Sequence, residues 1–189
     1  RATRRAAISM TTIGLISDTH IIRGGRRQLP PRVFEVFDGV DFILHAGDLN
    51  ILQVVTDLEA IAPTFAVYGN NDDWEALHTL PATRRMEVEQ CVVGLVHGDQ
   101  GRDSPKPLDF SGNRQTAANA LSRFVFEDDV NCVVFGHSHR SLVAWHELCD
   151  RKVLLFNPGS PTDRRYGPHH SVGLLRVDGK RLEPELITW

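Results

Sequence analysis

Short apolar runs and amphipathic segments alternate along the first half of the chain. Runs at 13–16, 42–44 and 65–68 are typical of short buried strands. Between them, residues 31–37 follow a Pro-Pro helix start, and residues 49–60 carry apolar side chains near helical spacing. The order β, α, β, α, β with short links favours a parallel sheet, in which ligands gather at the carboxyl ends of the strands.

The second half of the chain has a different pattern. Residues 86–88 and 91–96 predict a hairpin, and 132–135 predict another buried strand. A helix is expected at 115–126, with a buried face of Ala118, Leu121, Phe124 and Val125. Further strands are expected at about 141–147, 152–156, 171–177 and 181–187, with a tight Asn-Pro-Gly-Ser turn at 157–160 and the longest irregular stretch at 100–114. Parallel units followed by a meander indicate an α/β protein with two packed sheets and helices outside them.

Five of the apolar runs are followed at once by polar side chains that can bind metal ions. They are Asp18 and His20, then Asp48, Asn70, His97, and finally His137 and His139. Each short pattern by itself is typical of an ordinary turn, but five in succession after buried strands favour one shared site. Glycines beside these residues would let the backbone approach closely at a crowded centre.

The chemistry of these seven side chains indicates divalent metal ions. Imidazole, carboxylate and amide ligands without sulfur suit Mn, Fe, Zn, Ni or Co and argue against a structural zinc site. Seven ligands exceed the need of one ion, whereas two ions about 3.5–4 Å apart and bridged by a carboxylate would use all of them.

The ordered blocks also resemble a known family. Asp18-Thr-His20, Gly47-Asp48, Gly69-Asn-Asn-Asp72, His97-Gly98 and Gly136-His-Ser-His139 are similar to the five blocks of the calcineurin-like metallophosphoesterases, most of all to the small bacterial and archaeal phosphodiesterases. The resemblance covers roughly residues 12–178. It implies a four-layer αββα sandwich of two mixed sheets, with the metal site at the carboxyl ends of the strands. It implies one ion on Asp18, His20, Asp48 and His139, and another on Asp48, Asn70, His97 and His137, with manganese favoured.

The function that this resemblance implies is hydrolysis of a small phosphate ester by a hydroxide that bridges the two ions. Many members of the family have His where this chain has Asn71, and an amide cannot donate a proton at neutral pH. Diesters or activated substrates are therefore favoured over alkyl monoesters. The alternatives are a phosphomonoesterase or phosphoprotein phosphatase, and a non-catalytic scaffold such as the retromer subunit that shares this fold. Asp72 would orient its neighbours or, equally, cap a short helix at 73–78.

Other polar residues are weaker candidates. Arg164 and Arg165 could contact a substrate phosphate or lie in a solvated turn, and His45 could line the site or simply end its strand. Arg23, Arg26 and Arg27 could guide an anionic substrate but are more typical of a charged loop. His78, His169 and His170 are expected on the surface.

Charge and composition narrow the partners. A net charge of −3 over 189 residues does not favour binding to a nucleic-acid backbone. No apolar run approaches the roughly 18–20 residues of a membrane-spanning helix. The three cysteines predict buried thiols in a reducing compartment, and the first nine residues lack the apolar core of a secretory signal, so a cytoplasmic location is expected. We expect one domain at 12–189 after a disordered extension at 1–11. No pattern encodes the oligomeric state, and a homo-oligomer stays open.

Overall fold

The computed structural model describes residues 10–99, 113–124, 129–148, 151–165 and 167–189. The first sheet has the strand order β10-β9-β1-β2-β3. Its parallel strands are β1 (Thr11–Ile16), β2 (Phe42–His45) and β3 (Thr64–Ala66), and its antiparallel edge consists of β9 (Ser171–Asp178) and β10 (Arg181–Thr188).

The second sheet has the strand order β4-β5-β6-β8-β7. Parallel strands again form its centre, namely β5 (Cys91–Val96), β6 (Val130–Val134) and β8 (Arg151–Asn157). The antiparallel edge strands are β4 (Thr83–Val88), which forms the expected hairpin with β5, and β7 (Leu142–Leu148).

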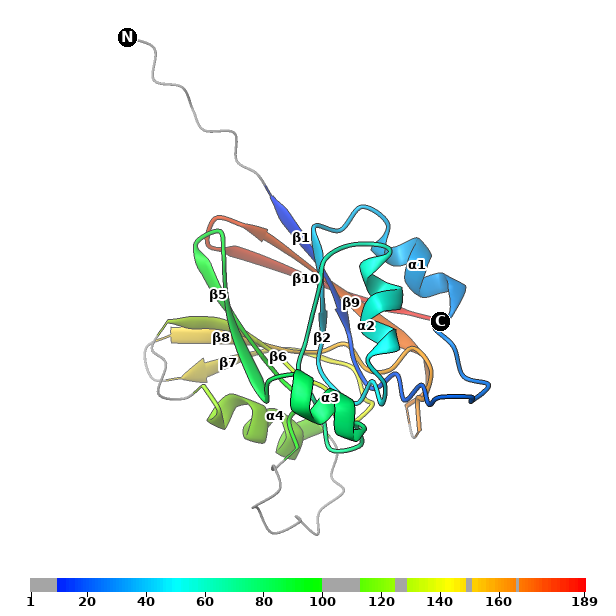
Figure 1. Cartoon of the computed structure of the whole chain (residues 1–189). Coiled ribbons are helices and arrows are strands. Elements are labelled where there is room, and N and C mark those ends of the chain that lie inside the picture. Colours follow the sequence, from blue (N-terminus) through cyan, green and yellow to red (C-terminus); the bar gives the residue numbers. More distant parts are fainter. Residues whose placement is uncertain (1–9, 100–112, 125–128, 149–150, 166) are drawn as a thin grey trace.

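Helices cover the outer faces of both sheets (Figure 1). Helices α1 (Pro31–Phe37) and α2 (Gln53–Glu59) pack on the first sheet, where Phe37 and Leu58 join Ile43 in one buried cluster. Helix α4 (Asn113–Ser122) packs on the second sheet through Ala120, beside Val133. A third cluster, which includes residues of both sheets, fills the space between them. The four-layer αββα sandwich is therefore confirmed.

Two helix predictions need correction. Helix α2 begins at Gln53 and not at 49, because Asp48 and Asn50 adopt the left-handed conformation (φ 56° and 74°), which a right-handed helix excludes. Helix α4 spans 113–122, so Asn113 and Arg114 belong to it and not to the irregular stretch. Its residue Ala118 is exposed, whereas Ala117 and Ala120 are buried. Residues 1–9, 100–112 and Val125 lie outside the described part of the chain.

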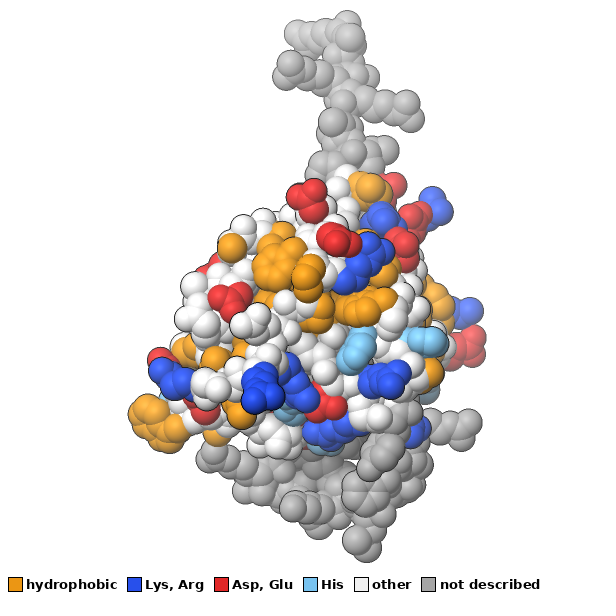
Figure 2. Space-filling view, turned by 90° about the vertical axis from the view of Figure 1, so that its right-hand side faces the viewer, with side chains coloured by type: hydrophobic (Ala, Val, Ile, Leu, Met, Phe, Trp, Pro, Cys, Tyr) orange, Lys and Arg blue, Asp and Glu red, His pale blue; other side chains and the backbone are white. Residues whose placement is uncertain are grey.

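The topology brings the ends of distant strands together. The parallel strands of each sheet run in the same direction, and a hydrogen bond from Gly136 N to His97 O (2.9 Å) continues the β5–β6 ladder into the following loops. The loops after β1 and β8 lie at the lower right of Figure 1. Figure 2 turns this side toward the viewer and shows Lys, Arg and His side chains on the lower half of the face.

Cys91 and Cys132 are buried free thiols, as expected. Within the described ranges, no helix has the length and apolar character that crossing a membrane requires.

Candidate metal centre

Asp18 and His20 lie on the loop after β1, beside the loop after β2 that carries Asp48. The two loops extend the parallel ladder, with hydrogen bonds from Asp18 N to Gly47 O and from His20 N to Asp48 O, both 3.0 Å. Asp18 and His20 are left-handed (φ 55° and 45°), so the chain turns at both residues and does not continue β1 as an extended strand. This strained backbone recurs at His137 and His139 (φ 68° and 58°) and is a common feature of functional loops.

Three histidines are held in one orientation by acceptors behind them. His97 Nδ1 lies 2.8 Å from Ala46 O, His20 Nδ1 lies 3.0 Å from Asn50 Oδ1, and His139 Nδ1 bonds Asp163 O. Since carbonyl oxygens only accept hydrogen bonds, each Nδ1 carries a proton and donates it. Where the ring is neutral, as in His20 and His139, the Nε2 lone pair is then free, which is how outer contacts orient histidine ligands of metals.

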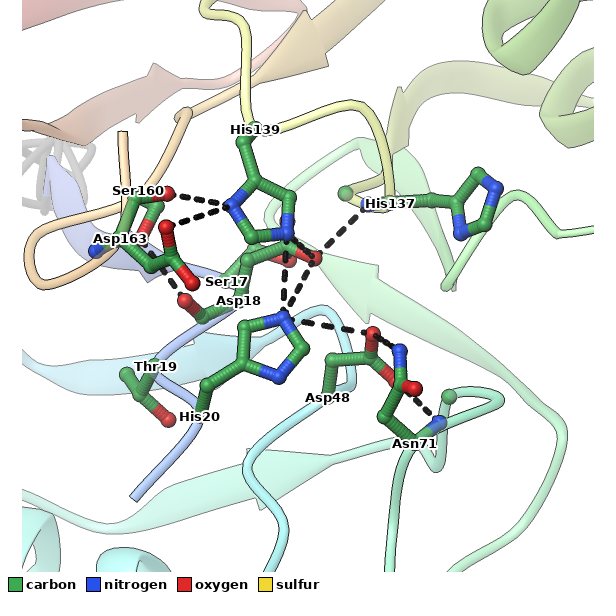
Figure 3. Close-up of polar contacts among 12 residues, drawn as sticks. Ser17, Asp18, Thr19, His20, Asp48, Asn71, His137, His139, Ser160 and Asp163 are labelled. Carbon is green, nitrogen blue, oxygen red and sulfur yellow. Dashed lines mark hydrogen bonds and ion pairs between the residues drawn. The ribbon is translucent and has the colours of Figure 1, made fainter. Parts of the chain in front are cut away.

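The Nε2 atoms of His20 and His139 face each other beside the buried carboxylates of Asp18 and Asp48 (Figure 3). His20 Nε2 lies 3.0 Å from His139 Nε2 and 3.5 Å from Asp48 Oδ2. His139 Nε2 lies 3.4 Å from Asp18 Oδ1, and the buried His97 Nε2 lies 3.3 Å from Asp48 Oδ2. His97 Nε2 forms no aligned hydrogen bond within the described residues. Lone pairs that converge in this way repel one another unless a cation lies between them.

The pKa values favour a metal ion over a shared proton between His20 and His139. Burial lowers the pKa of His139 to about 4 and also lowers that of His20, so both rings are neutral near pH 7. Burial alone would lower the pKa of His97, but the adjacent Asp48 raises it to about 10. His97 therefore holds a proton that a metal ion must displace. The donor set of imidazoles and carboxylates fits a divalent metal.

The two carboxylates have opposite pKa shifts. Burial raises the pKa of Asp18 to about 7, although the nearby His97 charge and a hydrogen bond from Ser17 Oγ (2.8 Å) oppose this. Burial also acts to raise the pKa of Asp48, but His97 and two bonds from Asn71 hold it well below its usual range. Asn71 donates through its backbone N (2.8 Å) and its side-chain Nδ2 (2.7 Å).

Asp72 connects the loops after β2 and β3 beside the centre. Its carboxylate accepts hydrogen bonds from Gly69 N (2.7 Å), Asn50 N (2.6 Å) and Asp48 N (3.2 Å). The alternative that Asp72 caps the following helix is wrong, because α3 (Trp74–Thr79) is capped by Asp73. Burial raises the pKa of Asp72 to about 6.

The structure gathers some of the expected ligands more closely than others. Two groups have ligand atoms within 4.8 Å of one another: Asp18 with His20 and His139, and Asp18 with Asp48 and His97. The ring centroid of His137 lies 5.2 Å from that of His97, but in Figure 3 the His137 ring points away from His20 and His139. Asn70 is exposed and forms no hydrogen bond with the described residues.

The glycines beside these residues are required for close approach. A Cβ atom on Gly69 would lie 2.3 Å from Asp48 Oδ1, and one on Gly136 would lie 1.8 Å from Ser17 Oγ. Neither position leaves room for a side chain. The expectation of a crowded centre is confirmed at both positions.

Sequence reasoning missed several residues that support the centre. Ser160 Oγ donates to Asp18 O (2.7 Å), and Thr162 Oγ1 donates to Thr19 O (2.6 Å). Asn50 and Asp163 orient His20 and His139, as described above. Asn50 stands two residues after Asp48, as His20 does after Asp18, and this repeat was the available signal.

The weaker candidates have ordinary surroundings in most cases. His45 is fully buried behind the centre, where its Nε2 lies 3.1 Å from Thr19 Oγ1. Arg27 pairs with Asp163 (3.2 Å), and Arg23 pairs with Glu75 (3.8 Å). The remaining residues are exposed, apart from His170, which is half-buried beside Trp189: Arg26, His78, Arg164, Arg165 and His169.

Comparisons with known proteins agree with this geometry. The sequence model of one protein family, the calcineurin-like phosphoesterase superfamily domain, matches residues 11–180. A probable metallophosphoesterase from Methanothermobacter thermautotrophicus is 38% identical over 176 residues, which cover 93% of this chain and 91% of that protein.

Solved structures share the fold. A conserved uncharacterized protein from Streptococcus pneumoniae, a predicted phosphoesterase, superimposes with a TM-score of 0.67 at 21% identity, covering 96% of this chain and 91% of that one. Wild-type Vps29 from Entamoeba histolytica, complexed with Zn²⁺, gives a TM-score of 0.66 at 19% identity, with coverage of 94% and 99%. At these identities the likeness concerns the fold alone.

Proposed function

Because this chain belongs to the calcineurin-like phosphoesterase superfamily, we propose that it is a dinuclear metal-dependent phosphodiesterase. The observation that carries the proposal is that the Nε2 atoms of three histidines converge on Asp18 and Asp48. Those of His20 and His139 are unprotonated, and that of His97 carries a proton that a metal ion can displace. Phosphoesterase chemistry and divalent metal binding follow from the family and the clusters. The second ion, the preference for diesters and manganese are the proposed refinements.

The proposed ligands are those that the sequence indicated. Asp18, His20 and His139 would hold one ion, Asn70, His97 and His137 the other, and Asp48 would bridge them. Bound ions would neutralise the charge of the substrate phosphate and provide a hydroxide nucleophile at neutral pH. For Asn70 and His137, this assignment requires the exposed amide and the outward ring to turn toward Asp48.

The residues of the chain have separate tasks in this proposal. Asn71 would orient Asp48 through the two hydrogen bonds described above, and Asp72 would fix the loop that carries both. The Asn71 amide can donate a hydrogen bond to the phosphate but cannot protonate a leaving oxygen. Substrates with weakly basic leaving groups, and diesters in particular, therefore suit the site best.

Hydrolysis of bis-p-nitrophenyl phosphate tests the proposal. The protein is stripped of metal, assayed, and assayed again after Mn²⁺ is restored, with p-nitrophenyl phosphate as the monoester for comparison. We expect diester cleavage that depends on metal and is lost in Asp48→Asn. Asp57→Asn is the matched control, since Asp57 is exposed on α2, where its Oδ1 accepts a hydrogen bond from Gln53 Nε2 (2.9 Å). Inert wild-type protein with metal bound would refute the proposal and favour the scaffold alternative.

Asn71→His tests the substrate preference separately. A histidine there could protonate a leaving oxygen, and general acid catalysis contributes on the order of 10²-fold or more. We expect the ratio of monoester to diester hydrolysis to rise by at least about tenfold. An unchanged ratio would show that Asn71 does not set the preference.

A further inference from the structure

A pocket with a volume of about 440 Å³ shares His139 with the candidate metal centre. Three segments that lie far apart in the sequence form it: residues 139–141 between β6 and β7, residues 167–169 between β8 and β9, and Thr188 at the end of β10. Gly167 lies against the backbone of His139, since a Cβ atom on this glycine would be 3.4 Å from His139 O. The pocket is large enough for a small organic molecule.

Hydrogen bonds hold the wall of the pocket that residues 167–169 form. The side chain of Arg164 donates from Nη1 to Pro168 O (2.9 Å). The backbones of His170 and Trp189 form two hydrogen bonds with each other (3.1 and 3.0 Å), so this wall is also fixed to the end of β10. Because the wall is held in place before any ligand binds, less conformational entropy is lost on binding.

Four side chains of the pocket can donate hydrogen bonds. Arg140 contributes a guanidinium and His169 an imidazole, and Ser141 and Thr188 contribute hydroxyl groups. The guanidinium of Arg140 and the ring of His169 form no hydrogen bond or ion pair with the described part of the chain. None of the described residues that line the pocket is Asp or Glu. The positive charge of Arg140 is therefore not neutralised within the pocket, which suits an anionic ligand.

We propose that this pocket binds a phosphate monoester. The three terminal oxygens of a monoester can accept hydrogen bonds from Arg140, His169 and the hydroxyl groups together, whereas a carboxylate offers only two oxygens. Guanidinium also matches phosphate geometrically, because it donates two parallel hydrogen bonds. The organic group of the ligand would lie against Gly167 and Pro168.

The inference goes beyond the proposed function, because binding in this pocket does not require that the metal centre cleaves esters. The two are connected by chemistry, since hydrolysis of a phosphodiester releases a phosphate monoester. Where both hold, the pocket would retain a product of the reaction beside His139.

Calorimetry with phenylphosphonate tests the inference, because this ligand has the charge of a monoester but no ester bond to hydrolyse. Metal-free protein is titrated first, so that no bound ion attracts the phosphonate. We expect saturable binding that is at least about tenfold tighter than that of phenylacetate or inorganic phosphate. Arg140→Gln should weaken it by about tenfold or more, and His169→Gln by about threefold. Arg123→Gln, at an exposed position after α4, is the matched control and should bind as the wild type does.

Titration of Mn²⁺-loaded protein separates this inference from the proposed function. Metal ions would offer a second phosphonate site, so the wild type should bind one equivalent more than Arg140→Gln does. If only the equivalent that depends on Arg140 is found, the inference stands and the proposed metal chemistry loses support. If metal-free wild type shows no saturable binding, or Arg140→Gln binds phenylphosphonate as tightly, the inference fails and the proposed function is unaffected. Equal affinity for phenylacetate or inorganic phosphate would also overturn it.

Discussion

Metal binding at the centre should release protons, because His97 cannot hold a proton and a metal ion on the same Nε2 atom. In the protein, Asp48 outweighs burial and raises the pKa of His97 to about 10. Burial raises the pKa of Asp18 to about 7. His20 and His139, with their lowered pKa values, have no proton to lose near neutral pH.

The pKa values of His97 and Asp18 determine how many protons metal binding should release at each pH. At pH 8, His97 is protonated and Asp18 is largely ionised, so metal binding should release about one proton, and at pH 6 it should release about two. The apparent association constant should rise about tenfold for each pH unit between 7 and 10, or about 1.4 kcal/mol per unit, and more steeply below pH 7.

Isothermal titration with Mn²⁺ in buffers of different ionisation enthalpy measures the protons released. Wild-type protein and two variants are compared at pH 6 and pH 8. His97→Gln retains a donor toward Ala46 O but has no titrating ring, and it should release about one proton fewer. His78→Gln, at an exposed position on α3, should behave as wild type. Release near zero at pH 8 in the wild type, or equal release in His97→Gln, would refute the reasoning.

Three further predictions concern the surroundings of the centre. Gly69→Ala should weaken Mn²⁺ binding by about 10–100-fold in calorimetry, because its Cβ would displace Asp48. Gly39→Ala strains a left-handed backbone (φ 79°) but its Cβ meets no atom within 4 Å, so it should leave Mn²⁺ binding unchanged. Asp73→Ala should remove the α3 cap and lower the unfolding free energy by about 1 kcal/mol in urea titrations, with metal affinity unchanged. Burial lowers the pKa of His45 to about 3, below its unfolded value. Protonation therefore favours unfolding as pH falls from 6.5 toward 3, by about 1.4 kcal/mol per unit, and His45→Gln should flatten this dependence in denaturation curves.

Much of the fold could be predicted from the local pattern of apolar and polar residues. Burial of short apolar runs requires strands, and the spacing of the runs in the first half leaves room only for helical crossovers, so β1, β2 and β3 could be predicted as parallel. The boundary of α2 could not, because residues 49–60 have an apolar spacing that also suits a helix from its first residue. What excludes the helix there is the left-handed backbone of Asn50, whose N bonds Asp72, 22 residues away.

The same division holds for the candidate site. The sequence by itself determined which side chains follow the strands, since His97 directly follows an apolar run and Asp18 and His139 come shortly after one. Only the tertiary structure decided the state and direction of those side chains. Ala46 and His97 are 51 residues apart, and the residues that face His139 come from both ends of the chain. Hydrogen bonds and burial depend on such distant neighbours, and they determine which nitrogen of each histidine is free and which carboxylate is ionised.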